Sequence, residues 1–390
     1  MAQDQNLYCA LAKHGLGINN QGYLTPCCQW YARDAALPEL PWQETERYIQ
    51  EVRYKIVSEL DAGIQHTGCR HCWHEEKLGY KSMRLDWNPR IAEKIDLESI
   101  QHEHNHVLDI ELCLGNFCNL RCMMCGPYAS SQWETIYKKN QEQARQWWTL
   151  PEQKAAWWEQ PGFIEWLTPH LKTCLRINLT GGEPLLIPQT ETIIDRIIEL
   201  GREKEITLQI SSNLTKLSDS ILEKLSKFQT VFLSVSLEGT EHMNDYVRYP
   251  AKWTDIQANI EKIKQRGSRN ISVSINHTFQ HASVYSIPAL IEFCWKNKMH
   301  FHLTSVHGHQ QLTIPGVPPQ DLARLISWTK STAWLNTPGW PQSVKQYILG
   351  LEGTEFDPAI YQRFREYVAF IDATNHTDWN QTFCPSDPFA

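Results

Sequence analysis

The stretch VLDIELCLGNFCNLRCMMC, residues 107–125, joins a strand-like run to three closely spaced cysteines. Its first seven residues are mostly apolar and predict a strand at 107–113. Cys118, Cys122 and Cys125 then follow within eight residues, in a C-x3-C-x2-C pattern. Three thiolates on one loop can hold three irons of a [4Fe–4S] cluster and leave the fourth iron without a protein ligand. An alternative is a zinc site in which Cys113 supplies a fourth thiolate.

Strand-like and helical segments alternate along the chain after this stretch. Further strands are predicted at 174–180, 206–211, 230–236, 271–277 and 300–306. Between them, apolar residues recur at helical spacing, as in 193–198, 217–228 and 287–294. Because parallel strands need a crossover connection, usually a helix, this pattern predicts an α/β fold with a parallel sheet. Six repeats over residues 107–310 predict an open, partial (β/α)6 barrel similar to a TIM barrel, with catalytic groups where the strands end.

Composition and charge argue against several classes of protein. Of 390 residues, 42% are hydrophobic and 21% are charged, which is ordinary for a soluble globular chain. No apolar run approaches the roughly 18 residues of a membrane span, and the start does not resemble a signal peptide, so a cytoplasmic location is expected. The net charge of -7 without a basic block argues against nucleic-acid binding. Twelve cysteines in a reducing compartment indicate metal or redox cofactors.

Residues 1–90 carry a second group of cysteines and are expected to form a separate small domain. The pattern is Cys9-x17-Cys27 followed by Cys69-x2-Cys72, which has the shape of a complete four-thiolate site. Cys28 adjoins Cys27 and is an alternative ligand. The spacing alone fits zinc or an iron–sulfur cluster equally well. Four ligands leave no open iron, so such a site would transfer electrons or brace the structure.

Two other parts of the chain leave alternatives open. Residues 91–106 form an expected linker, in which His102, His104 and His106 fit either a metal site or a solvated joint. Residues 311–390 are expected to form a helical C-terminal extension, without an assigned role. Six tryptophans after the cysteine loop indicate either a helical insertion that packs its rings inward or a lid that stacks on substrate; they are Trp133, Trp147, Trp148, Trp157, Trp158 and Trp166.

The three-cysteine loop resembles the signature of the radical S-adenosylmethionine (SAM) superfamily. Further motifs follow at successive predicted strand ends in the order typical of that superfamily: T-G-G-E-P at 180–184, S-S-N at 211–213, and S-L-E-G at 236–239 with Y-V-R at 246–248. The resemblance covers about residues 107–310. The N-terminal cysteines resemble the twitch module, the one-cluster half of the SPASM domain, although here the module precedes the barrel. This second resemblance favours a [4Fe–4S] cluster at the four-cysteine site.

The resemblance implies a set of roles for individual residues. The cysteines of the loop would ligate the catalytic cluster, and the amino and carboxylate groups of SAM would chelate the open iron. The implied SAM contacts are Gly181, Gly182 and Glu183 for the amino group, Ser211 and Asn213 for the ribose, and Ser236 and Arg248 for the carboxylate. Met124 occupies a slot where the family often has an aromatic residue near adenine. Glu238 stands where relatives usually have aspartate and is a catalytic candidate.

The implied reaction is reductive cleavage of SAM to a 5'-deoxyadenosyl radical, which abstracts hydrogen from an unactivated carbon. An auxiliary cluster favours an oxidoreductase that modifies a peptide or small molecule by dehydrogenation or bond formation, with an electron donor such as flavodoxin or ferredoxin. Polar residues at strand ends are the substrate-pocket candidates, and His277 and His307 are the candidate bases; the others are Asn276 and His309. Each histidine could instead be a hydrogen-bonded part of the wall.

Two other functions remain open at this stage. An epimerase needs a hydrogen donor, commonly a thiol, and Cys294 and Cys384 are the loose candidates for that role. A non-catalytic iron–sulfur carrier or partner-binding protein would keep the fold without turnover. The G-G-E-P and S-S-N motifs together with Arg248 favour an enzyme, because a carrier needs no SAM pocket.

Overall fold

The structure is a computed structural model. It describes residues 7–30, 36–77, 81–93, 106–150, 156–266, 269–336 and 342–383. The chain divides into two compact units. Unit 1 consists of Met1–Gly115, Gln153–Gln209 and Lys227–Thr230, and unit 2 consists of Asn116–Glu152, Ile210–Ser226 and Val231–Ala390.

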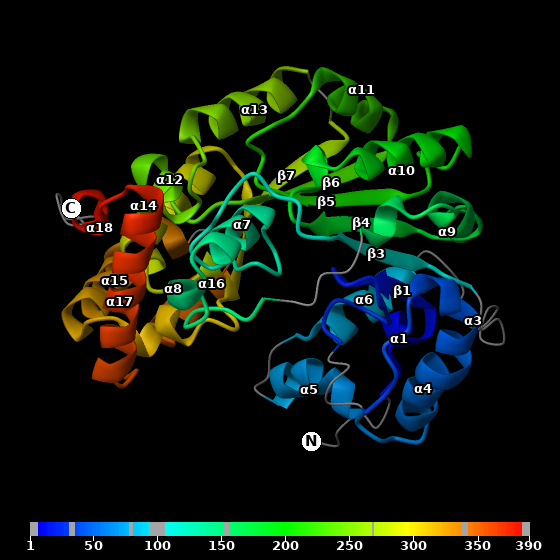
Figure 1. The fold of residues 1–390 in the computed structure, drawn as a ribbon, viewed down its shortest axis with the longest axis horizontal. Helices are drawn as coiled ribbons and strands as arrows, with labels where there is room; N and C mark the ends of the chain where they lie inside the picture. Colours follow the sequence, from blue (N-terminus) through cyan, green and yellow to red (C-terminus); the bar gives the residue numbers. More distant parts are fainter. Residues whose placement is uncertain are drawn as a thin grey trace. The chain divides into compact units, whose positions relative to one another are not determined.

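The strands belong to a mostly parallel eight-stranded sheet with the order β2-β1-β3-β4-β5-β6-β7-β8 (Figure 1). Their bounds are β1 Gly15–Ile18, β2 Leu24–Thr25, β3 Asp109–Leu114, β4 Arg176–Gly181, β5 Thr207–Ser212, β6 Thr230–Ser236, β7 Ile271–Phe279 and β8 His300–Ser305. The pairs β1–β3 and β3–β4 in unit 1, and β6–β7 and β7–β8 in unit 2, are parallel, while β1–β2 is antiparallel. The six strands predicted from the sequence are β3 to β8, and each bound is within two residues of the prediction.

Two glycines of β1 allow the N-terminal segment to lie close to the sheet in unit 1. Gly15 pairs with Asp109 and Gly17 with Glu111, so β1 extends the sheet beyond β3. A Cβ at Gly15 would lie 2.3 Å from the Pro26 carbonyl oxygen, and one at Gly17 would lie 2.4 Å from Thr25 Oγ1. Only glycine leaves room for the chain that leads into Cys27 and Cys28.

Unit 1 contains the N-terminal helices together with α9 and α10, which lie beside its part of the sheet (Figure 1). Helix α1 packs against α6 through Ala10, Leu11 and Ile91, with Leu108 beside them. The bounds are α1 Ala10–His14, η1 Trp42–Glu44, α3 Thr45–Arg47, the π-helical η2 Tyr48–Arg53, α4 Tyr54–Asp61, η3 Thr67–Cys69, α5 Arg70–Lys77, α6 Met83–Ala92, η4 Trp157–Glu159, α9 Phe163–Leu171, η5 Pro184–Leu186 and α10 Pro188–Glu199.

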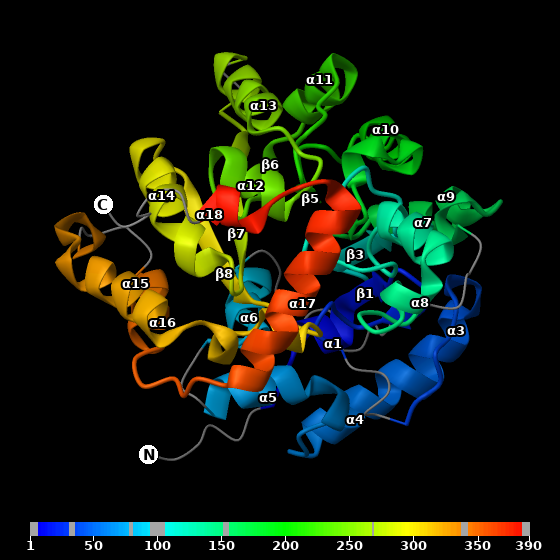
Figure 2. The same cartoon turned by 60° about the vertical axis from the view of Figure 1, so that its left-hand side comes forward.

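Unit 2 contains the remaining helices, of which α14 packs against β7 and β8, α15 against α14, and α16 against α15 (Figure 2). The predicted apolar face of α14 is buried, as Ile287, Leu290 and Ile291 show. The bounds are α7 Ser131–Lys139, α8 Gln141–Ala144, α11 Asp219–Lys227, α12 Glu241–Val247, α13 Trp253–Gln265, α14 Ser283–Lys296, η6 Gln310–Leu312, η7 Ile314–Gly316, α15 Pro319–Ser331, η8 Ala333–Asn336, α16 Gln342–Leu349, α17 Pro358–Asn375 and α18 Trp379–Phe383. The predicted helical nature of the C-terminal extension is therefore confirmed for its described part.

Aromatic side chains pack against one another in both units. In unit 2 the Trp147 and Trp148 rings lie against α17, with centroid distances of 4.8 Å from Trp147 to Tyr367 and 5.7 Å from Trp148 to Phe370. In unit 1 the Phe163 ring is the common neighbour of Trp42, Trp157 and Trp166, at 5.2 to 5.8 Å. The described tryptophan rings thus pack inward, as one of the two alternatives predicts.

The predicted domain boundaries are not settled by the fold. Residues 94–105 of the predicted linker, with His102 and His104, lie outside the described residues. At the end of that segment, the His106 carbonyl oxygen lies 3.2 Å from His14 Nδ1. The boundaries of the 1–90 domain and of the 107–310 barrel remain predictions. None of the described helices is long and apolar enough to cross a membrane.

Candidate functional site

The three-cysteine loop of unit 2 is fixed by hydrogen bonds to its backbone. Trp133 Nε1 donates to the Cys122 carbonyl oxygen at 2.9 Å, and the Tyr367 hydroxyl donates to the Met123 carbonyl oxygen at 2.7 Å. The Arg121 and Met123 N–H groups donate to the carbonyl oxygens of Tyr249 and Val247 at 2.7 and 2.8 Å. The loop is therefore held by α7, by α17, and by the end of α12 and the chain that follows it. The backbone positions from which the three cysteine side chains extend are therefore fixed.

The three thiols of the loop are close enough to affect one another. Cys118 and Cys122 are buried and Cys125 is half-buried. A hydrogen bond with Cys122, followed by burial, raises the pKa of Cys125 well above its usual range, and Cys118 adds to this shift. Because a bound cation stabilises a thiolate, metal binding would oppose this shift of the Cys125 pKa. The donor set, three sulfurs on one loop, fits a [4Fe–4S] cluster with one iron left open.

The described residues contain no set of three or more His, Cys, Asp or Glu side chains arranged for a metal ion. In a [4Fe–4S] cluster each thiolate binds a different iron, so the sulfurs need not converge on one point. Cys113, the alternative zinc ligand, lies in unit 1, where its thiol hydrogen-bonds Thr180 and burial raises its pKa to about 11.

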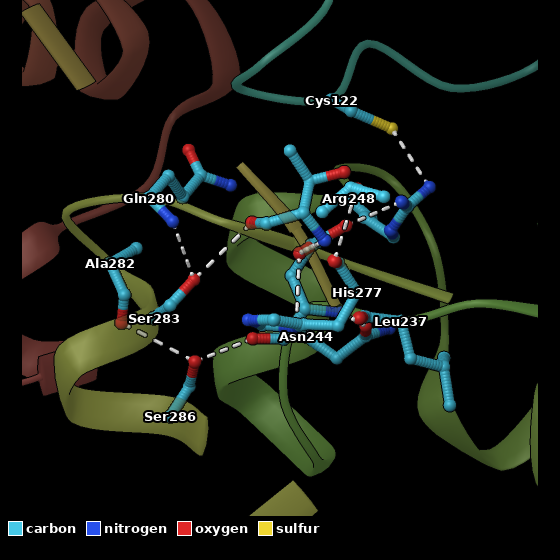
Figure 3. A network of polar contacts seen from close by, with 12 residues as sticks. Cys122, Leu237, Asn244, Arg248, His277, Gln280, Ala282, Ser283 and Ser286 are labelled. Carbon is cyan, nitrogen blue, oxygen red and sulfur yellow. Dashed lines mark hydrogen bonds and ion pairs between the residues drawn. The ribbon is translucent and has the colours of Figure 1, made fainter. Parts of the chain in front are cut away.

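A buried ion pair lies beside the Cys122 thiol (Figure 3). Arg248 Nη2 donates to Glu238 Oε1 at 2.6 Å, and Arg248 Nη1 lies 3.8 Å from Cys122 Sγ. Glu238 Oε2 accepts from the Thr278 N–H at 2.9 Å and lies 3.2 Å from His277 Nδ1. Burial raises the pKa of Glu238 to about 7, against the opposite effect of Arg248. Glu238 thus holds the Arg248 guanidinium beside Cys122, a candidate cluster ligand.

A second side chain reaches the Cys118 thiol from the end of β5. Asn213 Nδ2 lies 3.9 Å from Cys118 Sγ and donates to Asn119 Oδ1 at 2.9 Å. Its Oδ1 atom accepts from the Thr215 N–H and hydroxyl at 3.0 and 2.7 Å. Asn213 and Arg248, both expected to contact SAM, thus each lie beside a thiol of the loop. Of the other expected contacts in this unit, Ser211 and Ser236 are half-buried and Met124 is buried.

The G-G-E turn of unit 1 follows β4. Gly181 has a φ of 124°, and a Cβ there would lie 2.7 Å from the Leu114 nitrogen, so the turn requires glycine. The Gly182 N–H donates to the Gly115 carbonyl oxygen at 2.9 Å. The buried Glu183 side chain accepts from the Leu185 N–H at 3.0 Å and caps η5. Glu183 therefore has a structural partner in addition to its expected role.

The four N-terminal cysteines of unit 1 line one cavity. Cys9, Cys27, Cys69 and Cys72 all border it, together with Trp30, Trp73 and Arg84 among others. Burial raises the pKa of Cys9 to about 11 and that of Cys69 to about 12. Arg84 is fixed by Glu76, with Arg84 Nη2 donating to Glu76 Oε2 at 2.8 Å. Cys72 is buried and the other three cysteines are half-buried. Four thiols around one cavity are a donor set that fits an iron–sulfur cluster or another thiophilic metal centre.

Cys28 faces away from this cavity. Its thiol donates to Met83 Sδ at 3.6 Å, and the residue is exposed to solvent. Although the residue is exposed, surrounding protein atoms withdraw its thiol from water. This desolvation, followed by the charge of Glu111 and its hydrogen bond to the thiol, raises the pKa of Cys28 well above its usual range. The Glu111 carboxyl in turn accepts from Asn178 Nδ2 at 3.2 Å. Between the two adjacent cysteines, Cys27 is the one placed to serve the cavity.

Comparison with known proteins identifies one part of the chain. Residues 112–293 match the family model of the Radical SAM superfamily. This segment is therefore similar to a radical SAM domain. The match begins in β3, includes the three-cysteine loop, Asn213, Glu238 and Arg248, and ends in α14. It supports an enzyme with SAM-dependent radical chemistry.

Solved structures with weaker similarity extend over more of the chain. anSMEcpe with bound AdoMet is 13% identical, covers 57% of this chain and 60% of its own, and has a TM-score of 0.42. Streptococcus suis SuiB bound to S-adenosylmethionine is 16% identical, covers 82% of this chain and 66% of its own, and has a TM-score of 0.41. SuiB bound to precursor peptide SuiA is 15% identical, covers 88% of this chain and 66% of its own, and has a TM-score of 0.36. The chain thus spans about three fifths of anSMEcpe, and similarity at this level does not extend to activity or substrate. No curated protein matches the sequence significantly.

The histidines that were predicted at strand ends have different environments. His277 is fully buried, its Nδ1 lies 3.0 Å from the Leu237 carbonyl oxygen, and burial lowers its pKa to about 3. His307 is exposed and His309 is buried. His277 therefore matches the alternative of a wall histidine, while His307 remains accessible.

Several residues of the site were not predicted from the sequence. Asn119 and Thr215 position the Asn213 amide, and Asn244 Oδ1 accepts from the Glu238 N–H at 3.1 Å. Asn119 lies between two of the cysteines, so its position in the motif was a usable signal. Thr215 and Asn244 are in turn and helix segments whose sequence gives no comparable signal.

Proposed function

We propose that the chain is a radical SAM enzyme that abstracts hydrogen from an unactivated carbon and oxidises its substrate. The observation that carries this proposal is the group of three thiols on one fixed loop inside the segment that matches the superfamily. When bound, a [4Fe–4S] cluster on Cys118, Cys122 and Cys125 would supply the electron for reductive cleavage of SAM to the 5'-deoxyadenosyl radical. The protein would supply binding, orientation and exclusion of water.

The proposed SAM contacts keep their expected roles, with one addition from the geometry. Arg248 Nε is buried without a partner, while its two terminal nitrogens face Glu238 and Cys122. A buried unpaired donor of this kind is costly unless a ligand accepts from it. This supports the proposed contact between Arg248 and the SAM carboxylate. Ser211, Asn213 and Ser236 in unit 2, and the G-G-E turn in unit 1, remain proposed contacts for the rest of SAM.

We also propose that Cys9, Cys27, Cys69 and Cys72 ligate an auxiliary [4Fe–4S] cluster in a twitch-like module. Support comes from the cavity that all four border and from the orientation of Cys28 away from it. An auxiliary cluster can accept the electron that an oxidation releases, which favours dehydrogenation or bond formation over redox-neutral chemistry. His307 is the proposed base for the released proton, because it is accessible and His277 is not.

The substrate and partners are proposed by class alone. The substrate is a peptide or a small molecule, and a flavodoxin or ferredoxin is the proposed electron donor. Glu238 and His277, which were catalytic candidates, are proposed to act through Arg248 as positioning residues. Glu238 holds the guanidinium, and His277 contacts the second carboxylate oxygen of Glu238.

Epimerisation is a second candidate, and the Cys28 thiol favours it. Of the two earlier donor candidates, Cys294 is fully buried and Cys384 lies outside the described residues. Cys28, by contrast, is exposed to solvent and hydrogen-bonds Glu111. A thiol in this setting can give a hydrogen atom to a carbon-centred radical on the substrate.

The test of the main proposal is anaerobic reconstitution of the full chain, reduction with dithionite, addition of SAM and chromatography for 5'-deoxyadenosine. We expect 5'-deoxyadenosine and about eight irons per chain, which corresponds to two [4Fe–4S] clusters. The double variant Cys118→Ala, Cys122→Ala is the matched control and should give no 5'-deoxyadenosine. A wild-type chain that holds its iron, is reduced and never cleaves SAM would overturn the enzyme proposal and favour an iron–sulfur carrier.

A further inference from the structure

Two thiols of the three-cysteine loop each have a nitrogen donor from a different part of unit 2. Arg248 Nη1 lies 3.8 Å from Cys122 Sγ, and Asn213 Nδ2 lies 3.9 Å from Cys118 Sγ. These distances suit hydrogen bonds to sulfur, which is a larger acceptor atom than oxygen. Both donors come from segments remote in sequence from the loop, so their place beside the thiols is a product of the fold.

Both donors are buried and pinned by other side chains. Arg248 is 8% exposed and Asn213 is 6% exposed. The carboxylate of Glu238, which is 1% exposed, holds Arg248 Nη2 at 2.6 Å. The Asn213 amide is fixed through both of its atoms, by Asn119 on the nitrogen and by Thr215 on the oxygen. Neither donor can turn away from its sulfur without breaking these bonds.

The residue that holds Arg248 is itself fixed through its backbone (Figure 3). The Glu238 N–H donates to Asn244 Oδ1 at 3.1 Å, and the Ser286 hydroxyl donates to the Glu238 carbonyl oxygen at 2.5 Å. The Thr278 N–H occupies the second carboxylate oxygen at 2.9 Å. The carboxylate is therefore aimed at the guanidinium by helices α12 and α14 and by strand β7.

We infer that Arg248 and Asn213 donate hydrogen bonds to the cysteine thiolates of the proposed catalytic cluster and raise its reduction potential, with Glu238 as the positioning residue for Arg248. This inference rests on the proposed function. Reduction places additional negative charge on the cluster and its sulfur ligands, so a donor that faces a thiolate stabilises the reduced state. A charged donor forms the stronger bond, so Arg248 has the larger effect of the two.

A measurement without SAM separates this role from SAM binding. The measured quantity is the midpoint potential of each cluster in the reconstituted full chain. It is monitored through the electron paramagnetic resonance signal of the reduced clusters. In a separate sample, the signal that changes on addition of SAM identifies the catalytic cluster. We expect Arg248→Gln to lower its midpoint potential, and Asn213→Ala to lower it by less. The effect on 5'-deoxyadenosine formation is not the readout.

Arg121→Gln is the matched control for charge alone. Arg121 lies in the same loop between Cys118 and Cys122, but its Nε donates to Asn375 Oδ1 at 2.6 Å. Removal of this cation should shift the potential less than removal of Arg248. An equal shift would show that the Arg248 effect arises from its charge and not from a bond to the thiolate, and would overturn the inference for Arg248.

Two variants of Glu238 test its positioning role. Glu238→Gln keeps an oxygen acceptor for Arg248 and removes a negative charge, so the potential should stay or rise. Glu238→Ala removes the acceptor and releases the guanidinium, so the potential should fall even though a negative charge is lost. A rise in both variants would show that Glu238 acts through its charge alone.

The outcomes also separate this inference from the proposed function. A wild-type chain in which SAM alters no cluster signal contradicts the proposed function. A SAM-responsive cluster whose potential is the same in wild type, Arg248→Gln and Asn213→Ala overturns the inference alone. Should Arg248→Gln fail to load iron, Asn213→Ala, which removes only a neutral amide, decides the result.

Discussion

The two cysteine groups of this chain, both proposed to bind an iron–sulfur cluster, are assembled in opposite ways. In unit 2, three thiols come from eight consecutive residues, and hydrogen bonds to the loop backbone fix their positions. In unit 1, four thiols come from the start of α1, the segment after β2, η3 and α5, and tertiary packing brings them to one cavity. Local spacing therefore decides the first site, while the fold decides the second. Both can be tested by removing one thiol at a time.

The largest expected effect separates the two groups by their iron. We expect Cys122→Ala to abolish 5'-deoxyadenosine formation and to reduce the iron from about eight to about four per chain. Cys69→Ala should cause the same loss of iron but should leave the SAM-responsive paramagnetic signal in place. Iron analysis and the paramagnetic spectrum measure both effects. If Cys69→Ala removed the SAM-responsive signal as well, the two groups would not hold independent clusters.

A comparison of neighbouring cysteines sharpens the account of unit 1. Cys27 borders the cavity, whereas the Cys28 thiol faces Met83 and Glu111. We therefore expect Cys27→Ala to lose the auxiliary iron and Cys28→Ala to retain it. The adjacent variant is a close control, because each removes one sulfur atom from the same segment. Equal loss of iron in both would contradict the assignment of Cys27 as the ligand.

A smaller effect is expected where α17 holds the loop of unit 2. Tyr367→Phe removes the hydroxyl that donates to the Met123 carbonyl oxygen at 2.7 Å and should cost about 1 kcal/mol of unfolding free energy. It should also speed the loss of loop iron to a chelator. Tyr347→Phe, which removes a 2.8 Å contact with Ser305 Oγ, is the control and should leave the rate of iron loss unchanged. Equal rates in the two variants would argue against a role of α17 in holding the loop.

The smallest effect concerns pH and a buried histidine of unit 2. His281 stacks on Phe364 with ring centroids 3.5 Å apart, and burial lowers its pKa to about 3. Because the unfolded chain binds a proton below about pH 6.5 and the folded chain does not, stability falls as pH decreases through this range. Between pH 7 and 5.5 the expected loss is roughly 1 kcal/mol. Urea unfolding should show a smaller pH difference in His281→Phe, and an unchanged difference would show that another group titrates.

The sequence predicted the parts of this molecule that depend on local pattern. Strands β3 to β8 follow from apolar runs separated by helical spacing, and the C-x3-C-x2-C loop follows from cysteine spacing. Strand β1 was missed because its four residues, GLGI, contain two glycines and give no strand pattern. These glycines are needed because the chain at Pro26 and Thr25 passes close to them. The close approach depends on tertiary structure, which spacing does not reveal.

Contacts of individual side chains were also beyond the sequence. Arg248 and Asn213 were singled out by motif as SAM contacts, but their approach to two thiols depends on Glu238, Asn119 and Thr215. The C-terminal extension had no expected role, yet its helix α17 supplies the hydroxyl of Tyr367 and the side chain of Asn375 to the loop. Partners separated by some 250 residues leave no local trace in a sequence.

The bonds from α17 to the cysteine loop constrain the order in which the protein is assembled. Arg121 bonds to Asn375 and Met123 bonds to Tyr367, and these partners follow the loop by 254 and 244 residues. A ribosome-bound chain that has just exposed its three cysteines therefore lacks two of the groups that will close the loop. The hydrogen bonds that hold the three-cysteine loop are complete only after translation has passed residue 375, so a cluster delivered earlier would meet a loop that is not yet fully held.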